Sequence, residues 1–124
     1  MKKLDRDKLQ EIDRFLEEYY EKGATREAAA KMVKLKKTQV RGLENLLVSA
    51  TRFSEIINYI KNQAGKGREE WQSVAPELLK QLSEIESKAQ EMFPDDPEQR
   101  LLVKLKLARG WGRQIVAHYL YGKV

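Results

Sequence analysis

The sequence has no cysteine and only one histidine, His118, among its 124 residues. A chain without cysteine forms neither a disulfide nor a thiolate metal site, and it fits a reducing compartment. A single histidine also excludes a metal site that needs two histidines of the same chain. A serine–histidine pair stays open on composition alone, but we expect His118 to pack among apolar helix neighbours rather than to act in catalysis.

Long apolar runs are absent too, and none approaches the roughly 18 residues of a membrane span. The first fourteen residues, MKKLDRDKLQEIDR, are too acidic and too interrupted for a secretory signal. There are no strand patterns, no internal repeats and no low-complexity linker. We therefore expect one cytoplasmic domain over residues 1–124, with no membrane partner.

Apolar residues recur at spacings of three and four along most of the chain, which predicts an all-α fold: a single compact bundle of about five helices. The expected helices cover residues 4–22, 26–33, 38–65, 71–92 and 97–121, with one continuous helix over 26–65 as the alternative for the second and third. Thr25, Thr38 and Asp96 are the expected N-caps, since their side-chain oxygens can accept from free amides of the first turn. Pro76 fits only the first turn of the fourth helix.

The stretch from Lys34 to Arg68 holds the longest helical pattern, and we expect the chain to be organised around it. Its apolar positions form one stripe on a helix of roughly six or seven turns. The stripe consists of Val40, Leu43, Leu46, Leu47, Ala50, Phe53, Ile56, Ile57 and Ile60. Lysines and arginines flank this stripe at both ends, so the helix is expected to build a core and to present cations to a partner.

Charge is segregated along the chain. Residues 31–68 hold nine basic and two acidic residues, whereas residues 69–99 hold two basic and nine acidic ones. Residues 100–124 hold six basic residues and no acidic one. Two basic blocks separated by an acidic block favour a cationic face for a polyanion. The alternative is that the acidic helix pairs with the basic helices inside the bundle.

Catalytic patterns are weak, and we predict neither an enzyme nor a cofactor or metal site. Asp95 and Asp96 are adjacent carboxylates, but the flanking prolines favour a turn and a cap. Glu84 and Lys88 are expected to form a pair one helical turn apart rather than part of a nuclease site. The AGKGR segment lacks the spacing of a phosphate-binding loop, and no strand precedes it.

One binding hypothesis is a DNA-binding helix-turn-helix over residues 25–44. Ala30 stands where the first helix needs a small residue, and Val40 stands where the recognition helix packs back. The side chains that would face a major groove are Lys36, Lys37, Gln39 and Arg41. Against this, Lys34 occupies the turn position usually held by glycine, and the predicted recognition helix is some twenty residues longer than such modules need.

The other hypothesis comes from three segments: KKTQVRGLENLL, then FSEIINYIKNQAGKG, and, after a tryptophan, GRQIVAHYLYGK. Together they span roughly residues 36–122, and they resemble the small helical subunit of type III-A CRISPR interference complexes (the Csm complex). The resemblance implies a non-catalytic subunit of an antiviral ribonucleoprotein. It also implies copies that stack beside other effector-complex subunits, with basic side chains facing the guide RNA and the target RNA.

Lysines and arginines on helices suit contacts to backbone phosphates, which are independent of sequence and sensitive to salt. The candidate nucleic-acid-binding residues are Lys36, Lys37, Arg41, Lys61, Lys66, Arg109 and Arg113. Arg41 has an alternative partner in Glu44. Trp71 and Trp111 are expected in the core or in a subunit interface rather than under stacked bases. Tyr119 and Tyr121 are candidates for contacting a neighbouring copy.

Overall fold

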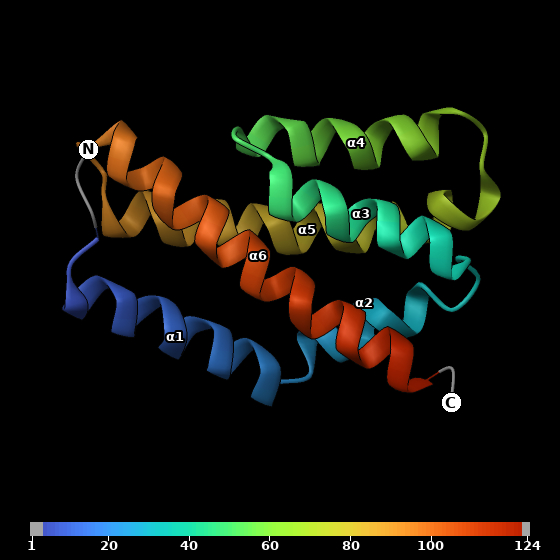
Figure 1. Ribbon diagram of the computed structural model, residues 1–124, viewed down its shortest axis with the longest axis horizontal. Coiled ribbons are helices and arrows are strands. Elements are labelled where there is room, and N and C mark those ends of the chain that lie inside the picture. Colours follow the sequence, from blue (N-terminus) through green and yellow to red (C-terminus); the bar gives the residue numbers. More distant parts are fainter. Residues whose placement is uncertain (1–3, 123–124) are drawn as a thin grey trace.

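The computed structural model describes residues 4–122, and over these residues the chain forms six α-helices and no strand (Figure 1). The helices are α1 (Arg6–Glu21), α2 (Ala24–Lys31), α3 (Lys37–Ser49), α4 (Phe53–Gly65), α5 (Glu69–Met92) and α6 (Pro97–Gly122). The all-α prediction is confirmed. The number of helices is six rather than five because the long helix predicted after Thr38 is two helices.

The break between α3 and α4 lies at residues 50–52, where Ala50 and Arg52 are extended. The carboxylate of Glu55 accepts hydrogen bonds from the Arg52 amide at 3.0 Å and from the Thr51 hydroxyl at 3.1 Å, so it stabilises the first turn of α4. Ala50 and Phe53, on either side of the turn, are both buried. The apolar spacing therefore runs through the break, and periodicity alone could not reveal it.

Helix α6, rather than the stretch of residues 34–68, is the element around which the chain is organised. It packs against each of the other five helices and crosses α5 diagonally (Figure 1). Two glycines inside α6 permit this packing. A Cβ atom at Gly110 would lie 2.4 Å from Leu16 Cδ1, and one at Gly112 would lie 2.3 Å from Leu47 Cδ1. The glycines therefore allow side chains of α1 and α3 to approach the α6 backbone.

Helix α5 begins at Glu69, earlier than predicted, so the expectation that Pro76 lies in a first turn is wrong. Pro76 is the eighth residue of α5 and is exposed. Glu69 and Glu70 supply negative charge to the first turn, where the helix dipole favours it. The proline removes one backbone N–H from the helical ladder. The helix continues through it and buries the apolar side that the sequence predicts.

A polar network crosses the core and joins α5, α6 and α2. The Trp111 indole donates to Gln81 Oε1 at 2.8 Å, and Gln81 Nε2 donates to the Ala24 carbonyl at 2.9 Å. The Thr25 hydroxyl donates to Gln114 Oε1 at 3.0 Å. Thr25 is fully buried inside α2, so it is not the N-cap that the sequence predicts. Its hydroxyl bonds to α6 instead of to its own backbone.

The N-cap prediction succeeds at Asp96 and fails at Thr38. Asp96 Oδ1 accepts from the Gln99 amide at 3.1 Å, with α6 starting at the next residue, Pro97. Helix α3 begins one residue earlier than Thr38, with Lys36 at the N-cap position. Thr38 lies in the first turn and is exposed.

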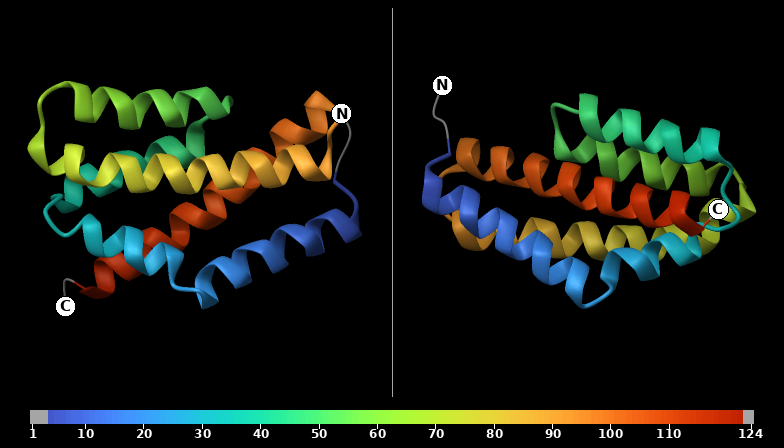
Figure 2. Two further views of the ribbon diagram at one scale, coloured as in Figure 1. Left: turned by 180° about the vertical axis from the view of Figure 1, so that it is seen from behind. Right: turned by 60° about the horizontal axis from the view of Figure 1, so that its bottom comes forward.

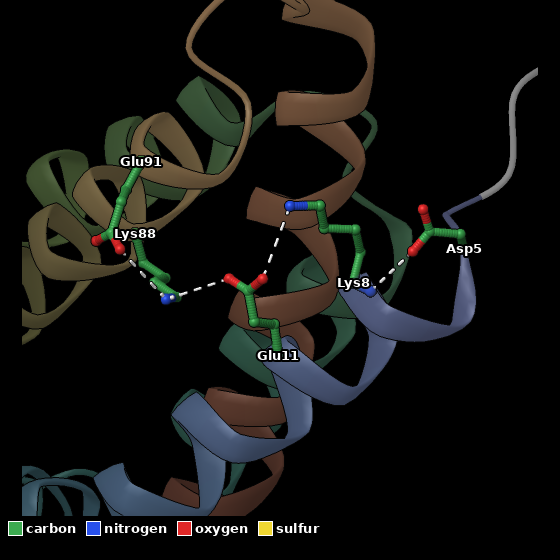
Figure 3. Close-up of polar contacts among 5 residues, drawn as sticks. All are labelled: Asp5, Lys8, Glu11, Lys88 and Glu91. Atoms are coloured by element: carbon green, nitrogen blue, oxygen red, sulfur yellow. Dashed lines mark hydrogen bonds and ion pairs between the residues drawn. The ribbon is translucent and has the colours of Figure 1, made fainter.

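Ion pairs tie α1 to α5 near the surface, as Figure 3 shows. Lys88 Nζ lies 3.4 Å from Glu11 on α1 and 3.7 Å from Glu91 on α5. Lys8 Nζ approaches Glu11 at 3.7 Å, and the Lys8 amide donates to Asp5 at the start of α1. Such partly exposed pairs contribute about 1 kcal/mol or less each, so they fix orientation more than stability.

The predicted pairing of Glu84 with Lys88 is wrong. The Glu84 carboxylate accepts a hydrogen bond from the hydroxyl of Tyr19, whose ring is buried between α1 and α5. Burial, and then this hydrogen bond, raise the pKa of Tyr19 above its ordinary value. Lys88 pairs instead with Glu11 on α1 and with Glu91 on its own helix, whereas Glu84 is engaged with the buried tyrosine.

Candidate nucleic-acid interface

Helix α3 begins within the first of the three resembling segments, and Thr38 to Arg41 lie near its start. The Lys36 amide donates to Gln39 Oε1 at 2.8 Å, which satisfies one end of the turn. Gln39 Nε2 donates to Glu70 Oε1 at 3.2 Å and so connects α3 to the start of α5. Val40 is buried. These contacts fix the position of the α3 start, which carries Lys36 and Lys37.

Lys36, Lys37, Lys66 and Arg68 gather at one end of the bundle, and we call them the basic end. The start of α3, the end of α4 and the start of α5 lie together at this end of the bundle, both in Figure 1 and in the view from behind in Figure 2. The pKa of Glu70 reflects, in part, the positive charge at this end. A backbone hydrogen bond and the bond from Gln39 lower the pKa of Glu70, and Arg68 and Lys36 lower it further. Arg68 was not among the seven candidate residues, although it is one of the cations that flank the apolar stripe and is two residues from Lys66.

Arg41 projects from the outer face of α3, and 70% of its side chain is exposed. Its guanidinium lies 3.8 Å from the Glu44 carboxylate, the alternative partner that the sequence offers. An exposed pair at this spacing on a helix is worth only about 0.5 kcal/mol or less. A phosphate group can therefore displace Glu44 at little cost.

Lys61 lies on the exposed side of α4, and Arg113 lies on the exposed side of α6. Within residues 4–122 neither side chain forms an ion pair. The acidic residues of α5 pair instead with Lys31, at 3.6 Å, and with Lys104, at 3.7 Å. The acidic helix therefore does pair with lysines inside the bundle, which was the alternative to a polyanion-binding face. These lysines are not among the seven candidate residues.

Arg109 has a different place from the one expected. It is half-buried, and its guanidinium donates to the carbonyls of Leu47 at 3.3 Å and Ala50 at 3.4 Å. These carbonyls belong to the end of α3 and the turn after it, where helical partners are missing. Arg109 thus stabilises the break between α3 and α4. It also borders a groove between α1 and α6 that Lys106, Asp13 and Arg113 line.

The seven predicted residues are thus distributed over three places. Lys36, Lys37 and Lys66 lie at the basic end, Arg41 and Lys61 lie on the outer faces of α3 and α4, and Arg109 and Arg113 border the groove between α1 and α6. Lys106 was missed, although its spacing of three residues from Arg109 places it on the same side of α6.

No group of histidine, cysteine, aspartate and glutamate side chains able to hold a metal ion occurs among residues 4–122. His118 Nε2 is buried without a hydrogen-bond partner, and its ring stacks on Tyr20 with centroids 5.3 Å apart. Over the same residues, no helix is both long enough and apolar enough to cross a membrane. Comparisons with protein-family models, with curated proteins and with solved structures find no match to this chain.

Proposed function

We propose that this chain is a non-catalytic, cytoplasmic small subunit of a type III-A CRISPR ribonucleoprotein effector complex in antiviral defence. In this role it contacts the backbones of guide RNA and target RNA through exposed cations on α3 and α4. Its other partners are the neighbouring subunits of the complex and further copies of itself. The proposal starts from the resemblance over residues 36–122.

One structural observation carries the proposal furthest: the cations of the resembling segments point outward and are not neutralised by the acidic helix. Val40 is buried, whereas the side chain of Arg41 is 70% exposed and meets only a weak partner on its own helix. Lys37 and Lys61 are exposed, and no carboxylate within residues 4–122 pairs with either. Unpaired cations on rigid helices suit phosphate contacts, which serve any guide sequence equally.

The proposal is tested by measuring binding of RNA duplexes of two unrelated sequences by fluorescence anisotropy, between about 50 and 200 mM salt. Arg41→Ala and Lys61→Ala should weaken both duplexes equally, and removing one phosphate contact should reduce the salt slope by about 0.7 to 0.9. Arg14→Ala is the matched control, because Arg14 is an exposed cation on α1, on the opposite edge of the bundle from α4 (Figure 1). Equal reductions in affinity from Arg14→Ala and Lys61→Ala would refute a localised face.

The assembly itself is tested by purifying the chain from its native host at moderate salt and identifying what comes with it. Short repeat-derived RNAs together with several large subunits are the expected result. A defined genomic DNA sequence without large partners would overturn the proposal.

The helix-turn-helix regulator remains the second candidate because of one observation. Helix α3 ends at Ser49, so the objection that the recognition helix is too long no longer holds. Two observations oppose this candidate. Ala30 is exposed instead of covered by a second helix, and Gln39 is engaged with Glu70 instead of free to read a base. A regulator should lose affinity for one DNA sequence in Arg41→Ala, whereas the RNA subunit should lose affinity for all sequences alike.

A further inference from the structure

Two adjoining hollows lie where α2 and the end of α1 meet the second half of α6. Their volumes are about 390 and 710 Å³, within the range of small-ligand sites. Both are lined by Arg26, His118 and Tyr121, so they adjoin at these side chains, and we call the two together the aromatic groove. None of the seven candidate residues except Arg113 borders it.

Flat rings form the walls of the aromatic groove. Tyr20 and His118 stack with their rings 20° from parallel, and Tyr20 is 55% exposed. Tyr121 is 80% exposed, whereas its neighbour Tyr119 is buried and donates its hydroxyl hydrogen to the Leu35 carbonyl. The Nε2 atom of His118, which lines both hollows, is buried without a hydrogen-bond partner in the described part of the chain.

The charge around the rings has one sign. Arg26 and Arg113 line the groove, and among the described residues no aspartate or glutamate lines either hollow. Neither arginine forms an ion pair within residues 4–122. The Arg26 side chain lies close to the turn between α1 and α2, where a Cβ at Gly23 would be 3.1 Å from Arg26 Nη2. The rings suit a planar partner and the arginines suit an anionic one.

We propose that the aromatic groove binds an unpaired nucleotide of RNA, with its base stacked on Tyr121 and its phosphate beside Arg26 and Arg113. Exposed aromatic rings next to arginines are the usual platform for single-stranded bases, because every base has a face that can stack. This inference rests on the proposed function in requiring RNA. It adds a preference for unpaired nucleotides, which phosphate contacts on α3 and α4 do not provide.

The test is a titration followed by nuclear magnetic resonance with two probes of equal length and charge: oligouridine and an abasic ribose-phosphate oligomer. The expected result is upfield shifts of the uracil protons, with matching changes at Tyr20 and Tyr121. Oligouridine should bind about 5- to 150-fold more tightly than the abasic probe, the effect of stacking one base. Tyr121→Phe should keep this ratio, and Tyr121→Leu should abolish it.

Two further variants separate stacking from charge and from simple apolar contact. Arg113→Ala should weaken both probes by the same factor. Val33→Ala removes exposed apolar surface but no ring, since Val33 is 58% exposed at the edge of the groove, and it should leave the ratio unchanged. A Tyr121→Leu variant that keeps the wild-type ratio would overturn the inference.

The failures are also distinguishable. If both probes bind equally and perturb only α3 and α4, the groove proposal fails and the proposed function stands. If neither probe binds anywhere, the groove proposal fails, and the duplex titrations alone decide the proposed function. If the Tyr121 signals change with protein concentration in the absence of RNA, the groove is a contact between copies of the chain, and the nucleotide proposal is overturned.

Discussion

Gln81 is the residue whose replacement tests the account of the core most directly. It is 2% exposed in the middle of α5, and it is the acceptor for the fully buried Trp111 indole. Its amide nitrogen donates to the Ala24 carbonyl at 2.9 Å and to Glu77 Oε2 at 3.0 Å. Gln81→Leu keeps a similar volume but removes all three hydrogen bonds.

The loss of stability in Gln81→Leu depends on which hydrogen bonds each former partner of Gln81 keeps. The Trp111 N–H has no other acceptor in the described part of the chain, so leaving it buried costs about 1–3 kcal/mol. The bond to Ala24 contributes about 1 kcal/mol. Glu77 loses the bond from Gln81, the main cause that lowers its pKa, but it keeps Lys31 at 3.6 Å and lies partly in solvent. The apolar surface of leucine offsets about 1 kcal/mol. The free energy of unfolding should fall by about 2 kcal/mol.

The assay is urea unfolding followed by far-ultraviolet circular dichroism. A destabilisation of about 2 kcal/mol corresponds to a melting temperature lower by roughly 8 °C for a chain of this length. Gln90→Leu is the matched control, because Gln90 is exposed on the same helix, and its effect should stay within about 0.5 kcal/mol.

A double-mutant cycle isolates the central bond. Trp111→Phe removes the donor, so combining it with Gln81→Leu should be less harmful than the sum of the single changes, by about 1–2 kcal/mol. Additive effects, or a Gln81→Leu protein as stable as the wild type, would refute the role assigned to the network.

Three other predictions follow from the packing and the titrating groups. Gly112→Ala should destabilise the fold by about 1–3 kcal/mol, because the buried side chain of Leu47 on α3 occupies the space that the new Cβ needs. Gly65→Ala should stabilise the fold by about 0.4–1 kcal/mol, because no atom lies within 4 Å of the position of the new Cβ. Pro76→Ala should stabilise it by about 2 kcal/mol by restoring a helical hydrogen bond. Burial raises the pKa of Tyr19 and Tyr59, so the contribution of these two hydroxyls to stability should be constant below about pH 10 and be lost above it.

Urea midpoints measure the glycine and proline predictions, and melting curves recorded between about pH 8 and pH 11 measure the tyrosine prediction. Equal effects of the two glycine replacements would contradict the packing around α6, and a Pro76→Ala protein less stable than the wild type would contradict the missing helical bond. Stability that increases above about pH 10 would contradict the burial of the tyrosine hydroxyls, since the folded state holds their protons more tightly than the unfolded state does.

The helices and the core were predictable because burial in this fold follows helical periodicity. Leu78, Leu82, Ile85 and Ala89 repeat every three or four residues, and all are buried. The break after Ser49 was not predictable in this way, since the stripe continues across it. Thr25 was misjudged because its hydroxyl binds a partner 89 residues away, which no local capping rule can detect.

The exposure of the cations was also predictable for most of the candidate interface, because lysines on the polar side of a helix face solvent. Arg109 was the exception, since its acceptors are carbonyls 62 and 59 residues away. Tyr121 was a candidate for contacting a neighbouring copy, but nothing local in the sequence indicated the aromatic groove. Tyr20, Arg26 and Tyr121 come from three helices, and only the closing of α6 against α1 and α2 brings them together.

The position of α6 as the shared partner of all the other helices has a consequence for the time course of biosynthesis. Helix α6 follows α1 to α5 in the chain, so a growing polypeptide exposes five apolar faces before their common partner has been made. At roughly 5 to 20 residues per second, synthesis of the 26 residues of α6 takes about 1 to 5 seconds. During that interval the nascent chain is a ready substrate for chaperones, and any pause in translation within α6 prolongs its exposure to aggregation.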